Sequence, residues 1–113
     1  MRVLVAAVLT MSVAQLLDLA TFALMINRVG PAAEANPLVA AMYGGLGLPV
    51  VAIAKVALLA LVTAIVAMLA RVALLAGSAT HRMTTALIVG ILAIGIAAGV
   101  LGGATNTAAI GLL

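Results

Sequence analysis

The stretch that decides the fold is VLVAAVLTMSVAQLLDLATFALMI, residues 3–26, in which Gln15 and Asp18 are the only strongly polar side chains. A helix of this length reaches about 36 Å, enough to cross a hydrocarbon core of roughly 30 Å with some tilt. A glycine and a proline follow soon after and favour an end to the helix. We predict a first transmembrane helix over 3–26. The alternative is a signal peptide cleaved after Ala14, although its apolar part would be unusually long.

Two further stretches have the length and apolar character of membrane spans. Residues 49–70 are interrupted only by Lys55 and Thr63, and residues 84–103 contain no charged side chain. Each exceeds or approaches the roughly 20 residues that a transmembrane helix needs. The sequence therefore predicts one all-α domain over 1–113, an integral membrane bundle of about three transmembrane helices.

A short extra helix is expected between the first two spans. Asn36 followed by Pro37 is typical of a helix start, because asparagine caps the free N–H groups and proline lacks one. The glycine-rich segment 44–49 then interrupts the pattern. We expect a helix over about 37–43 that is interfacial or re-entrant, or else forms the start of a kinked second span.

The composition excludes most soluble functions. Hydrophobic residues make up 68% of the chain and charged residues 6%, against roughly 45–50% and 25% in soluble domains. The basic residues are scattered, so we expect no nucleic-acid partner, and the lipid bilayer is the partner that the composition demands. Without cysteine and with one histidine, the common thiolate and zinc sites are excluded. We predict no enzyme activity, no cofactor and no metal.

The positions of the basic residues predict the orientation in the cell membrane. Arg2 shares a side with the segment from Arg71 to Arg82 if there are three spans, whereas Arg28 on the other side is offset by Glu34. Because cytoplasmic loops carry an excess of basic residues, we predict a multi-pass protein with a cytoplasmic amino terminus and an external carboxyl terminus.

Asp18 is the most informative residue, because a carboxylate inside a span costs roughly 2.5–3.5 kcal/mol on insertion scales and generally faces a partner within the bundle. Lys55 is the candidate partner. At 1.5 Å per residue, Asp18 and Lys55 lie about 12 and 9 Å below the same membrane surface. Gln15 shares a helix face with Asp18, and Thr21 continues it by one turn.

Other polar residues converge on the same outer half of the membrane. Glu34 and Asn36 lie in the outer loop, where capping explains them adequately, and Asn106 reaches that surface at the end of the third span. We favour a structural polar seam over a transport or binding site, and both interpretations stay open. The candidate intramembrane cluster comprises Gln15, Asp18, Thr21, Glu34, Asn36, Lys55 and Asn106.

A row of glycines marks a face for close helix packing. Gly95, Gly99 and Gly103 recur every four residues and let a second backbone approach closely. The pattern does not reveal whether that backbone belongs to the same chain or to another copy. We expect a contact that includes another subunit, because three small helices have little interior of their own.

The polar residues also form an ordered pattern. Asp18-x-x-Thr21 comes first, then Glu34-x-Asn36-Pro37, then Lys55 and finally Asn106. This order resembles an uncharacterised family of small bacterial and phage-borne membrane domains of about three helices. The resemblance implies that these positions form one polar unit, and it implies no activity, substrate or cofactor.

Three functions are compatible with these features. The first is a non-enzymatic membrane protein that acts by helix association, as a homo-oligomer or as an accessory subunit of a larger membrane complex. The second is a proton- or cation-coupled transporter or channel in which Asp18 binds the ion and Lys55 is the counter-charge. The third is a phage holin, for which small size, few charges and hydrophobic spans suffice.

Overall fold

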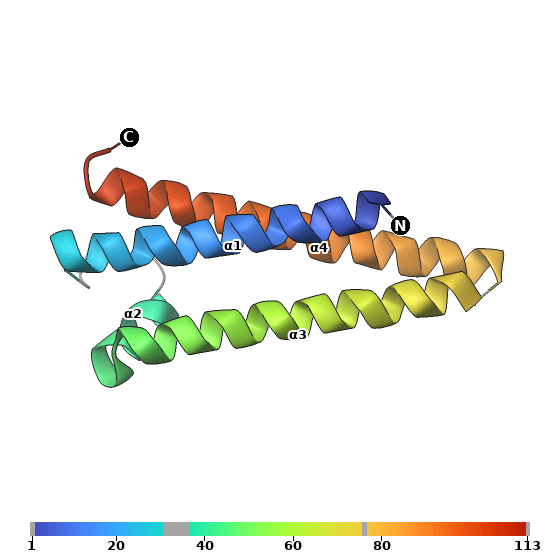
Figure 1. Ribbon diagram of the computed structural model, residues 1–113, viewed down its shortest axis with the longest axis horizontal. Coiled ribbons are helices and arrows are strands. Elements are labelled where there is room, and N and C mark those ends of the chain that lie inside the picture. Colours follow the sequence, from blue (N-terminus) through green and yellow to red (C-terminus); the bar gives the residue numbers. More distant parts are fainter. Residues whose placement is uncertain (1, 31–36, 76, 113) are drawn as a thin grey trace.

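The computed structural model describes residues 2–30, 37–75 and 77–112 (Figure 1), and over these ranges its regular structure is helical. The four helices are α1 (Arg2–Arg28), α2 (Pro37–Leu46), α3 (Leu48–Leu75) and α4 (Ser78–Ala109). The predicted all-α bundle is thereby confirmed. The long helices extend beyond the predicted spans at both ends, and α4 begins six residues before residue 84.

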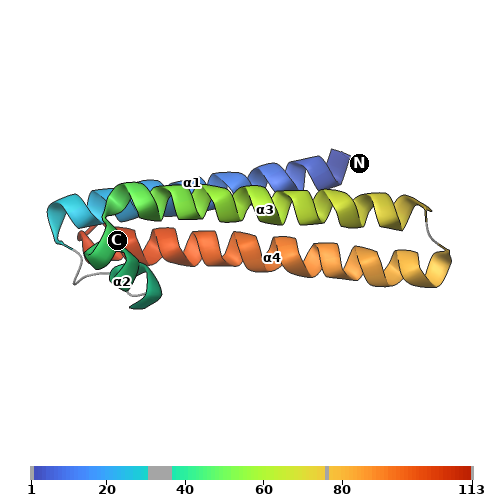
Figure 2. The same cartoon turned by 90° about the horizontal axis from the view of Figure 1, so that it is seen from below.

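The three long helices lie lengthwise beside one another in a bundle whose longest dimension is 52 Å. Figures 1 and 2 show that α1 and α4 run in the same direction and that α3 runs back between the same two ends. All three are long and apolar enough to cross a membrane. Their lengths of about 40–48 Å exceed the hydrocarbon thickness, so their ends reach the polar surfaces.

A single glycine separates α2 from α3. Gly47 has φ +83°, in the left-handed region that a side chain disfavours, and its N–H donates to the Tyr43 carbonyl at 2.8 Å. This is the usual way in which a glycine ends a helix. The chain therefore turns sharply at Gly47, and α2 and α3 do not form one continuous helix.

Helix α2 lies at the end of the bundle where α1 and α4 end and α3 begins (Figure 1). Its Tyr43 ring meets the Phe22 ring of α1 edge to face, with centroids 6.2 Å apart. Phe22 belongs to a buried cluster that is completed by Met25, Ile26 and Val51. Asn36, the expected cap of this helix, lies outside the described residues, and an interfacial or re-entrant place for α2 stays a prediction.

The opposite end is closed by the turn between α3 and α4. Gly77 is the N-cap of α4 with an extended backbone, and it makes no side-chain cap. The His81 N–H donates to the Gly77 carbonyl at 2.9 Å, and His81 Nδ1 lies 2.8 Å from the Ala73 carbonyl oxygen at the end of α3. The histidine thus ties the two helices together at their shared turn.

A second buried cluster joins the three long helices nearer this turn. Met11 of α1 and Val66 of α3 are each 1% exposed and meet Ile88 and Leu92 of α4. By contrast, large apolar side chains on the outer faces of all three helices are exposed. An apolar exterior around a small apolar core is what a bilayer as solvent requires.

Candidate functional site between the long helices

Helix α4 packs closely on α1 through its glycines. A methyl group on Gly95 would lie 2.6 Å from the Met11 sulfur, and one on Gly99 would lie 2.7 Å from the Ala14 carbonyl carbon. Real side chains essentially never show separations this short, so a methyl group would force the flexible Met11 side chain to move at Gly95 and would collide with backbone at Gly99. The glycine face that we expected to contact another subunit is therefore occupied by α1 of the same chain.

The third close glycine is Gly102 and not the predicted Gly103. A methyl group on Gly102 would overlap the Asp18 carboxylate, whereas one on Gly103 would lie 3.8 Å from Thr21 Oγ1, an ordinary van der Waals distance. Gly102 thus makes room for a charged side chain against the α4 backbone. The predicted spacing of four residues holds for the first pair of glycines and then changes to three.

This change of spacing has a recognisable signal in the sequence. Alternating steps of three and four residues follow the seam of left-handed helix packing, the usual arrangement in membrane bundles. The residues of α1 that face these glycines are also separated alternately by three and four positions. The seam comprises Met11, Ala14 and Asp18 on α1, and Gly95, Gly99, Gly102 and Asn106 on α4.

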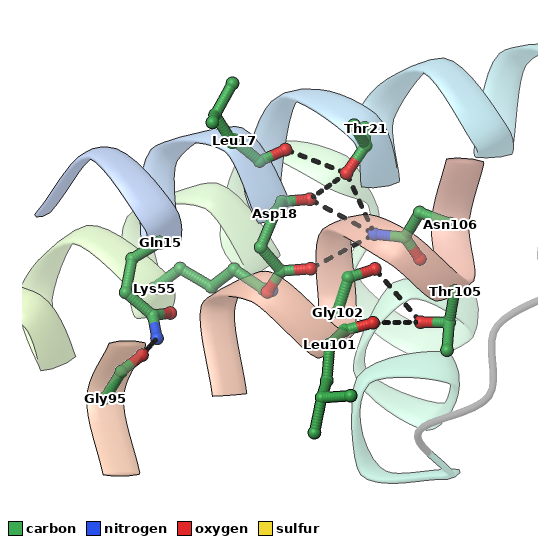
Figure 3. Close-up of polar contacts among 10 residues, drawn as sticks. All are labelled: Gln15, Leu17, Asp18, Thr21, Lys55, Gly95, Leu101, Gly102, Thr105 and Asn106. Carbon is green, nitrogen blue, oxygen red and sulfur yellow. Dashed lines mark hydrogen bonds and ion pairs between the residues drawn. The ribbon is translucent and has the colours of Figure 1, made fainter. Parts of the chain in front are cut away.

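Asp18 and Lys55 form an ion pair between α1 and α3 (Figure 3). Lys55 Nζ lies 2.5 Å from Asp18 Oδ2. The Asp18 side chain is 13% exposed and that of Lys55 is 22% exposed. The lysine ammonium also lies 5.8 Å from the centre of the Phe22 ring, within the range of a cation–π contact.

Asn106 joins the carboxylate to α4. Its amide nitrogen donates to Asp18 Oδ1 at 3.1 Å and also lies 3.2 Å from the Asp18 carbonyl oxygen. It is 3.3 Å from Thr21 Oγ1, whose own hydroxyl donates to the Leu17 carbonyl at 2.8 Å. Asn106 is 2% exposed. Both carboxylate oxygens of Asp18 therefore have a donor, one from each neighbouring helix (Figure 3).

Gln15 makes a separate contact one turn away from Asp18. Its amide nitrogen donates to the Gly95 carbonyl oxygen at 2.6 Å, which is possible because the glycine leaves that part of the α4 backbone uncovered. Of the seven residues in the predicted cluster, the structure brings together Asp18, Thr21, Lys55 and Asn106, with Gln15 beside them. Glu34 and Asn36 lie outside the described residues.

A groove of about 630 Å³ runs beside this cluster. Its floor is α1, where buried Met11 and Asp18 face it, and its rim consists of exposed residues of α3 and α4, such as Leu58 and Leu101. The walls are mainly apolar. The groove lies within the range of roughly 300–1,000 Å³ that is typical of small-molecule sites.

The chemistry of the cluster is that of a satisfied polar network. Within the described ranges, every buried side-chain nitrogen or oxygen has a hydrogen-bond partner, and those ranges contain no group of three or more residues that could hold a metal ion. Asp18 is the acceptor shared by Lys55 of α3 and Asn106 of α4, so the three long helices meet at one carboxylate.

The fold and the cluster fit one class of protein, a small helical membrane protein whose three long helices are joined by polar contacts within the apolar region. Comparison with known protein families, with curated proteins and with solved structures gives no match for this chain.

Proposed function

We propose that this protein is non-enzymatic and acts by helix association in the membrane, as a homo-oligomer or as an accessory subunit of a membrane complex. The observation that carries the proposal is a second face of small residues, on α3. Ala57, Ala60, Ala64 and Ala67 are all exposed. Faces of this kind let helices approach closely in a bilayer.

The alanine face lies on the side of α3 that is turned away from the bundle. The buried residues of α3 are Val51, Val66 and Ala73, and they mark the face that contacts the other helices. At 3.6 residues per turn, Ala60 and Ala64 lie on the opposite face. Association through this face therefore leaves the ion pair and the α1–α4 contact intact.

The polar cluster supports this proposal by its completeness. Asp18 accepts hydrogen bonds from Lys55 and Asn106, so both of its carboxylate oxygens are paired with neighbouring helices of the same chain. A cluster of this kind fixes helix register. We therefore assign it a structural role and place the contact with other subunits on α3.

We expect the Ala60→Leu/Ala64→Leu variant to weaken association at least tenfold, about 1.4 kcal/mol. The larger side chains would hold the partner helix away from the α3 backbone. Energy transfer between labelled copies in liposomes measures this, with dilution into lipid to obtain the affinity. Ala97→Leu, an exposed alanine on α4, is the matched control and should associate like the native protein.

If the double variant associates as tightly as the Ala97→Leu control, the alanine face is not the contact. If the native protein shows no self-association at any dilution, the homo-oligomer is excluded. The accessory-subunit arrangement then predicts that native complexes isolated from membranes retain the wild-type chain and lose the Ala60→Leu/Ala64→Leu variant.

A second candidate function is proton or cation transport, which one observation favours. Asp18 and Lys55 both line the groove and are both partly exposed, so a small ion has a route to the carboxylate. We expect, on this alternative, a saturable flux in liposomes that Asp18→Asn abolishes. Flux without saturation would instead favour a phage holin, and no flux supports the association proposal.

A further inference from the structure

We propose that the groove binds one acyl chain of a lipid, with the carbonyl oxygen of that acyl group accepting a hydrogen bond from Lys55 Nζ. This site goes beyond helix association, because it lies on the bundle side of α3 and the alanine face lies on the other. The assignment combines the size of the groove, its length and the unused hydrogen-bonding capacity of Lys55.

The length of the groove fits an acyl chain within one leaflet of a bilayer. Its lining along α3 runs from Val51 to Val62, which is about 16 Å at 1.5 Å per residue. One leaflet of a hydrocarbon core of roughly 30 Å is about 15 Å deep.

The groove has one polar end. Along α3, Lys55 is nearer to Val51 than to Val62. It is therefore nearer to the end of the bundle where α2 packs and α3 begins. Toward the other end, the lining is apolar at Met11, Val62 and Ile94, and the Gln15 amide donates to the Gly95 carbonyl. An amphiphile placed with its polar group beside Lys55 therefore points its hydrocarbon tail toward the middle of the membrane, as lipids of that leaflet do.

Lys55 retains hydrogen-bond donors for such a ligand. A lysine ammonium has three N–H donors and no acceptor. Among the described residues, Lys55 Nζ makes one hydrogen bond, to Asp18 Oδ2. The side chain lines the groove and is 22% exposed. Within the described residues, the remaining donors are therefore available to an acceptor oxygen in the groove.

The ion pair also selects the kind of acceptor. Lys55 and Asp18 together carry no net charge, and the Asp18 carboxylate lines the same groove. The pair therefore offers little net Coulomb attraction to a full anion, whereas an uncharged carbonyl oxygen needs only an N–H donor. The acyl carbonyl of a lipid ester supplies this chemistry.

The site is tested by native mass spectrometry of the detergent-solubilised protein, with palmitoyl lysophosphatidylcholine and palmitic acid added separately. Ala98→Phe places a ring in the groove, while Ala97→Phe adds the same ring to the neighbouring exposed position outside it. We expect Ala98→Phe to weaken at least tenfold the binding of the palmitoyl compound that the native protein binds. Ala97→Phe should leave that binding unchanged. Equal binding by both variants overturns the site. A change in oligomeric state with Ala98→Phe, without a change in lipid binding, assigns the groove to a second copy and also overturns it.

The role of Lys55 is tested with the ether analogue of the lysolipid, which lacks the acyl carbonyl. The native protein should bind the ester about tenfold more tightly than the ether, the effect of one hydrogen bond to a charged donor. The neutral variant Asp18→Asn/Lys55→Met should lose this preference while still binding the chain, and its melting temperature verifies that it is folded. Equal binding of ester and ether by the native protein overturns the carbonyl assignment. Binding of palmitic acid without binding of the lysolipid would overturn the assignment to a lipid ester.

Discussion

Gly99→Leu is expected to remove the packing of α1 on α4 and to destabilise the bundle by about 3 kcal/mol or more. A methyl group alone at this position would lie 2.7 Å from the Ala14 carbonyl carbon and 2.9 Å from its oxygen. Backbone atoms cannot rotate away as a side chain does, so the two helices must separate. Overpacking of a core by single methylenes already costs about 1–3 kcal/mol. The measurement is thermal unfolding in detergent, together with the yield from membranes.

Gly90 supplies the matched control within the same helix. A methyl group there would meet no atom within 4 Å, so we expect Gly90→Leu to melt at or above the native temperature because helix propensity improves. Gly99→Ala should also lower the melting temperature, whereas Gly90→Ala should not. Equal melting of the two alanine variants would show that α1 and α4 do not approach as closely as the structure has them.

Removing either Asp18 or Lys55 alone is expected to be worse than removing both. Lys55→Met leaves the Asp18 carboxylate without its ammonium, and Asp18→Asn leaves the ammonium beside an uncharged amide. A buried charge without its partner costs about 3–5 kcal/mol, whereas a neutral pair of similar shape is often nearly harmless. Each single variant should therefore melt well below the native protein, and the double variant should recover most of the loss.

The double-mutant cycle separates two roles of the carboxylate. Coupled residues give a double variant that loses much less than the sum of the single losses. If the losses simply add, then Asp18 and Lys55 act independently. The Asp18 carboxylate would then act mainly on an ion in the groove and not through its pairing with Lys55. That result would favour the transport function over helix association, and the flux measurement with Asp18→Asn would test transport directly.

The three long helices could be predicted because each contains an apolar run of the length that a spanning helix needs. The strands of a closed β-barrel, the other structure that satisfies the backbone in lipid, are only about 9–11 residues long. The neighbourhood of Asp18 and Lys55 was also predictable. Both residues are within a few turns of helix ends that share one surface, so counting residues gave their depths to within about one turn. The ion pair of 2.5 Å agrees with that estimate.

The partner of the glycine face was not predictable in the same way. A row of glycines shows that a backbone comes close, but it does not show whose backbone it is. We also expected Gly103 in the row, because a step of four residues follows Gly99. The structure uses Gly102, since left-handed packing alternates steps of three and four. Asn106, four residues beyond Gly102, was the available sign of that alternation.

The groove had no signal in the sequence. Its existence depends on how far α3 lies from α1 and α4, and that separation is set by the sizes of side chains in both buried clusters. Small residues such as Ala54, Gly95 and Ala98 line the space between the clusters. Their effect follows only when three helices are placed at once, which a pattern along one helix does not reveal.

The closest helix contact in the fold joins α1 to α4, the first and the last of the long helices to be synthesised. During translation α1 leaves the ribosome with a carboxylate that has no partner in its own helix. Lys55 supplies the counter-charge when α3 is inserted, and the glycine face and the Asn106 amide follow only with α4. The close packing of α1 on α4 therefore becomes possible only after α3 has been synthesised, and until then Lys55 is the only one of these partners available to Asp18.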